Sequence, residues 1–535
     1  MAVGESPATH RLVVFTGDLS YAVRKGILEI DAALPGTDWL ILLHAPNKTL
    51  RQLVRSQWLN LHRNGWRWIP YQLADIVRRA LPGSAAAAAP PGPGSEYSLD
   101  ALRRRGNVRL ERVADIHGTP ALDMLRRFDA ELGLSLAAPI LRRPAFALPA
   151  RGTINLHKGK LPDFRGMPPA FWELWHDQAS VGCSVHCVDE RLDTGALIAE
   201  ASVPRAPHAT LRGLQLQLDE VGIALMARTV PALLAGHVQP RPQPAGEGAT
   251  HRKPTLEQQA QLRRKLAPRI ALAAQPKRIL KEAAAEAVVR LHRLGLGKLA
   301  APRITVLLYH RVSDDVRDNL SVGIEQFDRQ MALLARHCRV LPIDQVLAAE
   351  SVPRSAQPMV AVTFDDGYLD NFQQAAPILR RHGIPAAFFV STGIVDSANR
   401  FPHDLRRGNA PIPVMRWDDL RAMRQWGFTI GSHTVNHIDC AAEPEDIVCD
   451  ELARSRDDLR RELGVEQPIF AYPYGGRQHM TAQRLERVRE AGYVGCLSAY
   501  GGTNIGRVDR FNVLRRGIHW EFSDRALMLE CLGLT

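Results

Sequence analysis

Apolar runs of strand length alternate with helical segments in two parts of this chain, and no other feature constrains its fold as much. "HRLVVFTGD" (10–18) and "TDWLILLHAP" (37–46) precede a helical stretch at 48–68, and a second series begins with "ITVLLYHRV" at 304. The chain has 535 residues, too many for one ordinary hydrophobic core. The pattern predicts two α/β domains, an N-terminal doubly wound sheet and a C-terminal β/α barrel, with reactive side chains at the carboxyl ends of their strands.

A basic segment separates the two series. Residues 251–303 hold 13 Lys or Arg against 3 Asp or Glu, so they carry most of the net charge of +12. Because the remainder is close to neutral, the charge argues against a general nucleic-acid binder. The apolar spacing predicts a helical linker between domains at 1–250 and 304–535. Two roles stay open for it: a solvated connection, or a basic amphipathic helix that binds an anionic membrane surface or a phosphate-bearing lipid carrier.

Composition bears on the compartment. The chain is 45% hydrophobic and 23% charged, as in soluble globular proteins, and no apolar run approaches the length of a membrane span. Its first residues lack the basic region and apolar core of a signal peptide. Seven cysteines include no CxxC pair, which favours reduced thiols. We therefore expect a cytoplasmic protein, peripheral to the membrane if the basic segment binds lipid. Residues 81–96, "LPGSAAAAAPPGPGSE", are a low-complexity insertion in the first domain.

Two motifs in the second series predict a metal-dependent hydrolytic site. Asp365 and Asp366 end the apolar run of "MVAVTFDDGY", and His433 and His437 stand four apart in "GSHTVNH", so that in a helical turn both rings face one way. Two imidazoles and one carboxylate suit a divalent ion with a position left for water. The second carboxylate can then take a proton from that water, because successive side chains of an extended segment point different ways.

With "AYPYG" after them, these motifs resemble the polysaccharide deacetylase (NodB-homology) family over residues 304–520. The resemblance implies a distorted β/α barrel, a divalent metal, most commonly zinc, and hydrolysis of an N-acyl group from an amino sugar. By position it implies Asp365 as general base and Asp366, His433 and His437 as metal ligands. It also implies that the backbone N–H of Tyr474 helps to hold the tetrahedral oxyanion.

The sequence departs from this family at two places. Many members have an arginine where this chain has Ala471, and Arg515 or Arg516 is a candidate replacement beside the base. The late Leu-x-His motif is replaced by "LRRGIHW", in which His519 is either the general acid or a structural histidine. His310, in "YHRV", is expected close to the site in a supporting role.

A different chemistry is indicated upstream. Asn155 and His157 alternate in "TINLH", so both can point to one side of an extended segment, and Asp193 follows in "RLDTG". An amide donor, an imidazole and a carboxylate suit acyl transfer to an amine, because the first two can stabilise an oxyanion and the His–Asp pair can move a proton. "LPDFRGMPP" is rich in Pro and Gly, as expected for a rigid loop that borders a ligand.

Together with that loop and "LDTG", these residues resemble the formyltransferase family over about 10–250, most strongly at 151–198. The resemblance implies a Rossmann-like sheet, 10-formyltetrahydrofolate as the formyl donor, and Asn155, His157 and Asp193 as the catalytic triad. A serine often found two residues after the histidine is Gly159 here. The start lacks a clean GxGxxG, so no nicotinamide site is predicted. The loop residues expected at the bound cofactor are Leu161, Pro162, Arg165 and Gly166.

Deacylation releases a free amine, and formyl transfer consumes one. The combination predicts a bifunctional enzyme that replaces an N-acetyl with an N-formyl group on an amino sugar, carried by a sugar nucleotide, glycolipid or oligosaccharide precursor rather than a tRNA. Two alternatives stay open. The second domain could be a deformylase acting on a formylated, lipid-linked amino sugar, or one half could be a non-catalytic binding scaffold.

Overall fold

The computed structural model describes residues 10–46, 50–70, 72–73, 97–244, 248–266, 302–406 and 411–533. The chain divides into two compact units, Met1–Pro268 and Arg269–Thr535. The predicted insertion at 81–96 and most of the predicted basic linker lie outside the described residues. The part of that linker that is described contains helix α9 (Leu256–Leu266).

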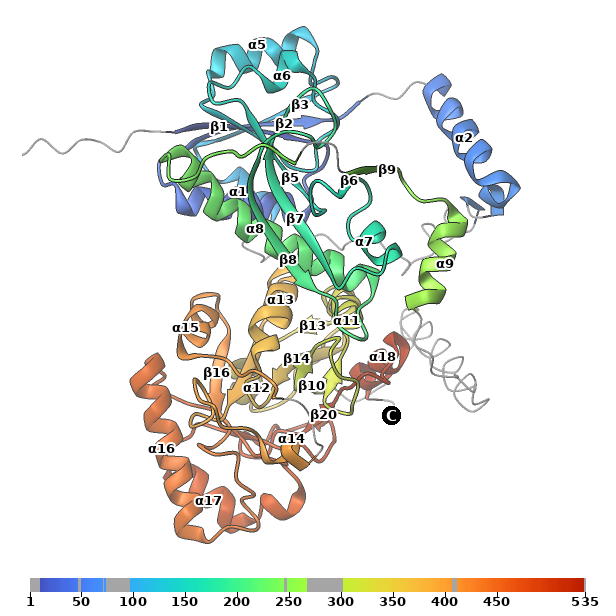
Figure 1. Ribbon diagram of the computed structural model, residues 1–535. Coiled ribbons are helices and arrows are strands. Elements are labelled where there is room, and N and C mark those ends of the chain that lie inside the picture. Colours follow the sequence, from blue (N-terminus) through green and yellow to red (C-terminus); the bar gives the residue numbers. More distant parts are fainter. Residues whose placement is uncertain are drawn as a thin grey trace, which may run out of the picture. The chain divides into compact units, whose positions relative to one another are not determined.

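The first unit is built on a seven-stranded sheet with the order β3-β2-β1-β4-β5-β7-β8 (Figure 1). The pairs from β3 to β5 are parallel, whereas β7 runs antiparallel to both β5 and β8. A small parallel pair, β6 with β9, lies apart from the sheet. The strands are β1 (Arg11–Thr16), β2 (Asp38–His44), β3 (Val108–Val113), β4 (Leu132–Ser135), β5 (Thr153–His157), β6 (Phe164–Gly166), β7 (Ser180–Cys187), β8 (Leu197–Pro204) and β9 (Ala249–His251).

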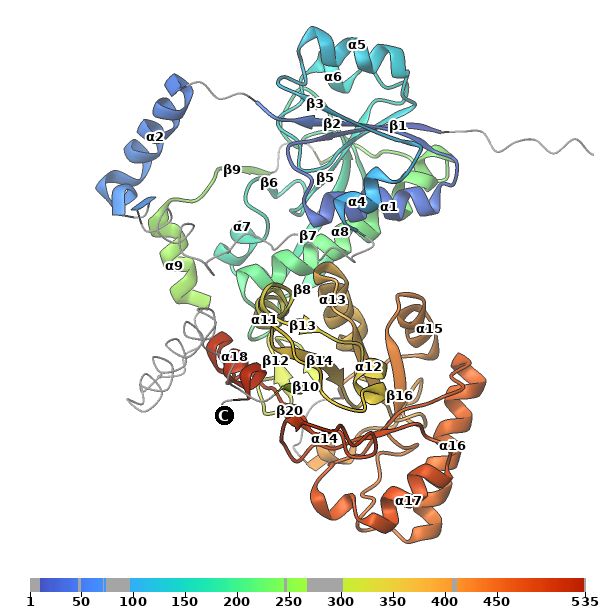
Figure 2. The same cartoon turned by 180° about the vertical axis from the view of Figure 1, so that it is seen from behind.

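Helices cover both faces of this sheet, as the doubly wound pattern predicts (Figure 2). Leu12 and Val14 of β1 pack with α1, α4 and α8 on one face, whereas Val13 and Phe15 pack with α5 and α6 on the other. The alternation follows from the two-residue period of a strand. The helices are α1 (Tyr21–Ala33), α2 (Leu50–Asn64), η1 (Gly65–Arg67), α4 (Leu99–Arg103), α5 (Thr119–Phe128), α6 (Arg143–Phe146), α7 (Phe171–Trp175) and α8 (Leu211–Leu234).

The second unit is a distorted barrel of mostly parallel strands. The pairing runs β18-β17-β16-β15-β14-β10, and β20 pairs in parallel with the other edge of β10. A parallel bridge between Leu497 and Val513 joins β18 to the segment that enters β20, so this segment closes the ring. The strands are β10 (Arg303–Tyr309), β11 (Arg311–Val312), β12 (Ser321–Val322), β13 (Arg339–Val340), β14 (Met359–Phe364), β15 (Ala386–Val390), β16 (Thr429–Ser432), β17 (Phe470–Ala471), β18 (Cys496–Leu497), β19 (Asn504–Ile505) and β20 (Arg515–Gly517).

Apolar side chains of β10, β14, β15, β17 and β18 fill the barrel core, among them Val306, Ala361 and Phe389. The helices that accompany the strands are α11 (Ile324–His337), α12 (Ile343–Ala348), η3 (Asn371–Ala375), α13 (Ala376–His382), α14 (Pro402–Arg406), α15 (Trp417–Gln425), α16 (Glu445–Leu463), η4 (Arg477–His479), α17 (Ala482–Glu490) and α18 (Asp524–Leu532). The later strands are short, because their backbone leaves the sheet early to form the loops that carry polar side chains.

The cysteines and the lengths of the helices bear on two predictions made from composition. All seven cysteines are free, and none is paired in a disulfide. Among the described residues, no helix is both long enough and apolar enough to cross a membrane.

Candidate functional sites

Strand β14 delivers the paired aspartates to the end of the barrel. All six of its residues are buried, and the chain then turns through Asp366 and Gly367, whose φ angles are 76° and 96°. A left-handed conformation is costly for a non-glycine residue and is common at functional sites. Beyond this turn, Asp365 pairs with Arg515 and Asp366 lies beside His437, whereas His433 lies within 4 Å of both carboxylates.

Asp365 forms a bidentate ion pair with Arg515 of β20. The two guanidinium nitrogens of Arg515 donate to Oδ1 and Oδ2 of Asp365 over 2.7 Å each, and both side chains are buried. Burial by itself raises the pKa of Asp365, but the charge of Arg515 outweighs it and holds the pKa below its ordinary value. Of the two arginines considered as replacements, Arg515 is the one that pairs with Asp365, whereas Arg516 pairs with Glu530.

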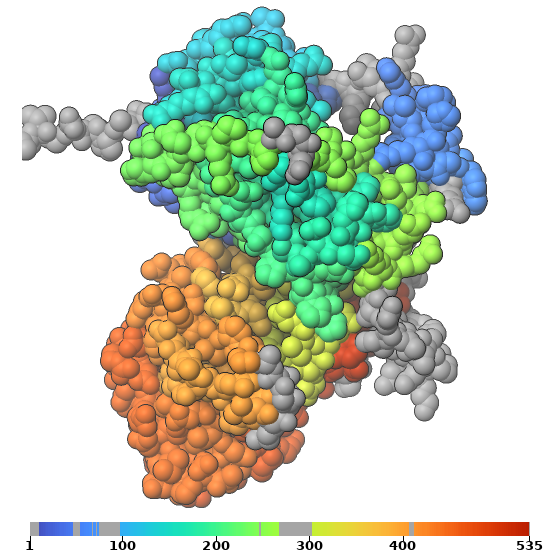
Figure 3. Space-filling view, viewed as in Figure 1, coloured from blue at the N-terminus to red at the C-terminus, as the bar shows by residue number. Residues whose placement is uncertain are grey.

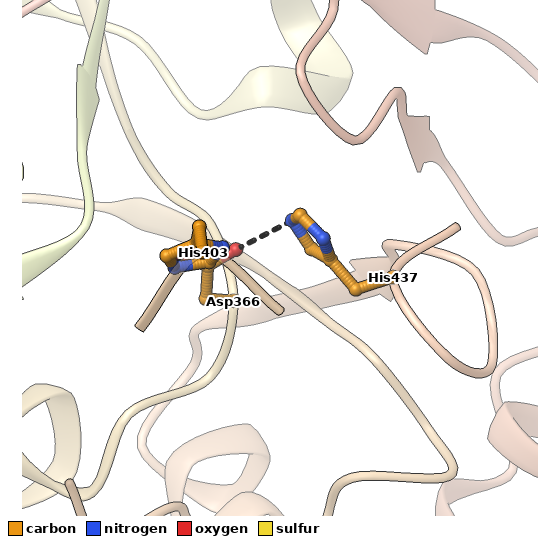
Figure 4. A group of neighbouring side chains, drawn as sticks. All are labelled: Asp366, His403 and His437. Carbon is orange, nitrogen blue, oxygen red and sulfur yellow. Dashed lines mark ion pairs between the residues drawn. The ribbon is translucent and has the colours of Figure 1, made fainter. Parts of the chain in front are cut away.

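Three imidazoles surround the carboxylate of Asp366. Nε2 of His437 and Nε2 of His433 lie 3.2 and 3.5 Å from Oδ1, and Nε2 of His403 lies 3.6 Å from Oδ2. Figure 4 shows Asp366 with His403 and His437, whose ligand atoms all lie within 4.8 Å of one another. The sequence motifs indicate His433 and His437 but not His403.

These residues fit a divalent ion. Both oxygens of Asp366 are buried, and neither accepts a hydrogen bond from the described residues. Burial raises the pKa of this carboxyl, but His437 and the other imidazoles outweigh it and hold the pKa far below its usual range. A buried, charged carboxylate without hydrogen bonds needs a cation as its partner. Burial also lowers the pKa of His433 to about 4, which keeps its ring neutral and able to ligate.

His433 is oriented for ligation by its other ring nitrogen. Nδ1 of His433 lies 2.7 Å from the carbonyl oxygen of Ala471, so it donates a proton there and leaves Nε2 facing Asp366. Histidines that bind metals commonly donate their second ring N–H in this way. Ala471 thus serves the site through its backbone.

The segment from His433 to His437 is a loop, so the expected helical turn is wrong. Thr434 and His437 have left-handed φ angles of 64° and 55°, and the backbone cannot make helical hydrogen bonds there. The carboxylate of Glu451 on α16 holds the loop instead. It accepts hydrogen bonds from the backbone N–H groups of Val435 and Asn436, each over 2.8 Å, and from Nδ2 of Asn436 over 2.6 Å.

The two remaining histidines differ in their surroundings. His310, at the end of β10, interacts electrostatically with Asp365 and Asp366, and burial lowers its pKa despite these two charges. His519 follows β20, and its ring contacts the backbone N–H of Glu521 and the ring of Phe522. Within the described part of the chain, no hydrogen bond or ion pair joins His519 to either aspartate.

Tyr474 lies in the loop after β17. Its φ angle is 60°, and its ring stands edge-on to the ring of His437 with a centroid distance of 5.0 Å. Its side chain is 39% exposed, so this residue places a partly exposed ring beside His437.

In the first unit, β5 delivers Asn155 and His157 to the end of the sheet beside Asp193. Nδ1 of His157 lies 3.4 Å from Oδ2 of Asp193, and Nε2 of His157 donates to the carbonyl oxygen of Phe164 over 2.7 Å. Burial lowers the pKa of His157, although Asp193 opposes this effect. The ring is therefore neutral near pH 7, with a carboxylate in place to stabilise the proton that it takes up.

A second histidine that the sequence motifs do not indicate completes this group. His186 of β7 lies opposite Asn155 in the antiparallel pair of β5 with β7. Nδ1 of His186 donates to the carbonyl of Cys187 over 2.8 Å, so Nε2 accepts from the amide of Asn155 over 3.1 Å. This contact orients the amide nitrogen of Asn155.

The loop predicted to border a ligand contacts the triad through its backbone. The N–H of Gly166 donates to Oδ2 of Asp193 over 2.9 Å, and Arg165 donates to Gln243, which in turn donates to the carbonyl of Asp193. Leu161 is buried, and Pro162 beside it is half-buried.

Gly159, two residues after His157, leaves no room for a side chain. A Cβ atom at this position would lie 2.5 Å from the carbonyl oxygen of Phe164 and 2.6 Å from Nε2 of His157. A side chain would therefore disrupt the hydrogen bond between these two groups. The position of the His157 ring thus depends on a glycine at 159.

Comparisons with known proteins agree with this division of the chain. The family model for formyl transferase matches residues 124–230, and that for polysaccharide deacetylase matches residues 353–495. Part of each half of the chain is therefore similar to one of these two families. A methionyl-tRNA formyltransferase of Myxococcus xanthus is 33% identical over 180 residues, which are 33% of this chain and 56% of that protein. A putative polysaccharide deacetylase of Bacillus subtilis is 25% identical over 187 residues, which are 35% of this chain and 61% of that protein.

The chain thus spans only 56% and 61% of the length of these two relatives. Among solved structures, a deacetylase of Streptococcus pyogenes in complex with acetate matches with a TM-score of 0.37 and 23% sequence identity. The match covers 43% of this chain and 99% of the deacetylase chain. A sugar N-formyltransferase from Shewanella sp. covers 48% of this chain and 87% of its own, at 15% identity and a TM-score of 0.31.

Replacing Arg515 by lysine should lower the rate of deacylation about 10- to 100-fold, because lysine keeps the charge but cannot hold both oxygens of Asp365. Any formyl transfer by the first unit should be unchanged, because Arg515 lies in the second unit. Acetate release under saturating substrate measures the effect, with Arg516→Lys as the matched control. An unchanged rate in Arg515→Lys would show that Asp365 is oriented by other groups.

Replacing Glu451 by alanine should weaken metal binding about 10- to 100-fold, because the loop that carries His433 and His437 loses three hydrogen bonds. Glu451→Gln keeps one acceptor oxygen and should retain most of the affinity. Chelator competition measures the affinity without reference to activity. Asp450→Ala, on the exposed side of the same helix, is the control, and equal affinities in all three variants would refute the role.

Proposed function

We propose that this chain is a bifunctional enzyme that removes an N-acyl group from an amino sugar in its second unit and transfers a formyl group to an amine in its first. The buried Asp366 carboxylate, which faces three imidazoles and accepts no hydrogen bond from the described residues, is the observation that carries the hydrolytic half. The contact of His157 with Asp193 supports the transfer half.

For deacylation, Asp366, His433 and His437 would hold the divalent ion, with His403 facing the second oxygen of Asp366. When bound, this ion supplies a Lewis acid that polarises the acyl oxygen and acidifies water. Asp365, fixed by Arg515, takes the proton of the attacking water. The carbon–nitrogen bond then breaks, and the nitrogen leaves as an amine after it receives a proton.

His310 is a better candidate than His519 for the donor of that proton. His310 interacts with both aspartates, whereas the described contacts of His519 are with Glu521 and Phe522. A general acid must reach the leaving nitrogen beside the base, and of these two histidines His310 is the one with a described interaction with the aspartates. We therefore assign the role to His310 and a structural role to His519.

For formyl transfer, the amine attacks the formyl carbon of a donor such as 10-formyltetrahydrofolate. His157 takes the proton that the amine loses, and Asp193 stabilises the resulting imidazolium. The amide of Asn155, oriented by His186, donates to the oxyanion that forms on the formyl oxygen. The carbon–nitrogen bond of the donor then breaks as its nitrogen receives the proton from His157, which leaves the formyl group on the amine and returns the imidazole to its neutral form.

Arg515 also favours an active second unit over a binding scaffold. A scaffold would not need a buried base held by two charge-assisted hydrogen bonds, since a buried ion pair is costly to form. The amine released by one unit is of the kind that the other consumes, which supports a shared amino-sugar substrate. The overall result would be an N-formyl group in place of an N-acyl group.

The roles of the two histidines can be separated by substitution. Replacing His310 by alanine should lower the rate of deacylation about 10²- to 10⁴-fold, the contribution typical of a general acid, with the metal content retained. His519→Ala should stay within about twofold of the unmodified protein. Acetate release and metal analysis on the same preparations test this. A larger loss of rate in His519→Ala than in His310→Ala would identify His519 as the general acid.

Incubation with N-acetylated amino sugars, a divalent metal and 10-formyltetrahydrofolate should release acetate and yield an N-formyl product, identified by mass spectrometry. Asp365→Asn should abolish acetate release only. His157→Ala should stop formyl gain and let the free amine accumulate. Release of formate from a formylated sugar, without acetate release, would favour the deformylase alternative. Neither product in any reaction would refute the bifunctional proposal.

A further inference from the structure

Exposed apolar side chains are concentrated in one short stretch of the first unit. Half of the large exposed apolar side chains of the described residues, seven of fourteen, fall between positions 54 and 73. The exposed fractions reach 57% for Trp58 and 74% for Trp66. Scattered exposed apolar residues need no explanation, but a cluster of this size marks an interaction site. The seven are Val54, Trp58, Leu59, Leu61, Trp66, Ile69 and Leu73, and we call them the 54–73 surface.

Helical spacing aligns most of these side chains. Val54, Trp58 and Leu61 are spaced by four and three on α2, so they share one face. In the stretch that follows, Trp66, Ile69 and Leu73 are three and four positions apart, which is again close to the helical period. Nε1 of Trp68 donates to Gln57 over 3.0 Å and joins the two stretches. None of the seven belongs to a hydrophobic core of the described residues, and Figure 3 shows the blue α2 segment at the edge of its unit.

The polar groups beside this apolar surface are basic. From Ala45 to Ala74 the sequence has no Asp or Glu. Arg55, His62 and Arg63 of α2 are exposed, and Arg55 and His62 are seven apart, which places them along one flank of the apolar stripe. Tryptophan with arginine at the border of an apolar face is typical of helices that lie in a membrane interface.

A second basic helix begins at the end of α2. The backbone N–H of Leu256, the first residue of α9, donates to Oδ1 of Asn64 over 3.0 Å. Arg263 and Arg264 in the last turn of α9 are exposed. The positive charge beside the 54–73 surface is therefore continued by a neighbouring element.

We propose that the 54–73 surface docks on an anionic lipid surface, with the Trp and aliphatic side chains in the interface and the arginines against the headgroups. A second copy of the chain fits less well, because a symmetric contact places the same patch on both sides and would bring basic flanks together without an acidic partner. Anionic headgroups complement this charge. The docking does not depend on either proposed reaction.

Co-sedimentation of the full chain with vesicles tests the proposal without a substrate. Binding to phosphatidylcholine vesicles containing ~30% phosphatidylglycerol should exceed binding to pure phosphatidylcholine by at least about tenfold, and raised salt should weaken it. Replacing both Trp58 and Trp66 by alanine should lower binding at least about tenfold, and Arg55→Glu with Arg63→Glu should lower it similarly.

Two variants outside the surface serve as controls. Ile140→Ala removes an apolar side chain that is 75% exposed, and Arg228→Glu reverses an exposed charge on α8, and neither should change vesicle binding by more than about twofold. The proposal is overturned if the unmodified chain does not bind anionic vesicles or binds neutral vesicles equally well. It is overturned as well if the chain with both Trp substitutions binds anionic vesicles as strongly as the unmodified chain. It is also overturned if light scattering shows a dimer that these substitutions dissociate, because the surface would then join two copies.

Discussion

The ion pair between Asp365 and Arg515 ties the hydrolytic site to the closure of the barrel. The two residues are 150 positions apart, one at the end of β14 and the other on β20, the strand that completes the ring. Removing one partner of such a pair leaves an uncompensated buried charge, which costs about 3–5 kcal/mol. The orientation of the base and the pairing of β20 with β10 are therefore coupled, so the last strand of the fold is also part of the site.

Backbone groups do much of the positioning at both sites. In the second unit, Glu451 binds two backbone N–H groups of the histidine loop, and the carbonyl of Ala471 fixes the ring of His433. In the first, β6 supplies a carbonyl to His157 and an N–H to Asp193. Backbone contacts place few demands on side-chain identity, so Ala471 can serve the site through its carbonyl without a polar side chain.

The strands that carry the site residues could be predicted from the sequence, because apolar runs that end on polar residues indicate buried parallel strands. The doubly wound sheet, the barrel and the neighbourhood of Asp365 and Asp366 follow from that pattern. The position of His403 could not be predicted, since it reaches Asp366 from a separate helix with no recognisable spacing. His186 was missed for a related reason, because its place opposite Asn155 depends on strand register.

The two proposed reactions make opposite demands on water. The hydrolytic unit needs a base that activates water, whereas the transfer unit must let an amine attack an acyl donor that water could also attack. A base such as Asp365 beside a formyl donor would activate water and promote hydrolysis of the donor. Each site is instead made from strands of its own sheet, and the bases of the two sites differ, a carboxylate in one and a neutral imidazole in the other. In the proposed reaction sequence, joining the units in one chain would raise the effective concentration of the amine for its second reaction, while each base acts on its own nucleophile.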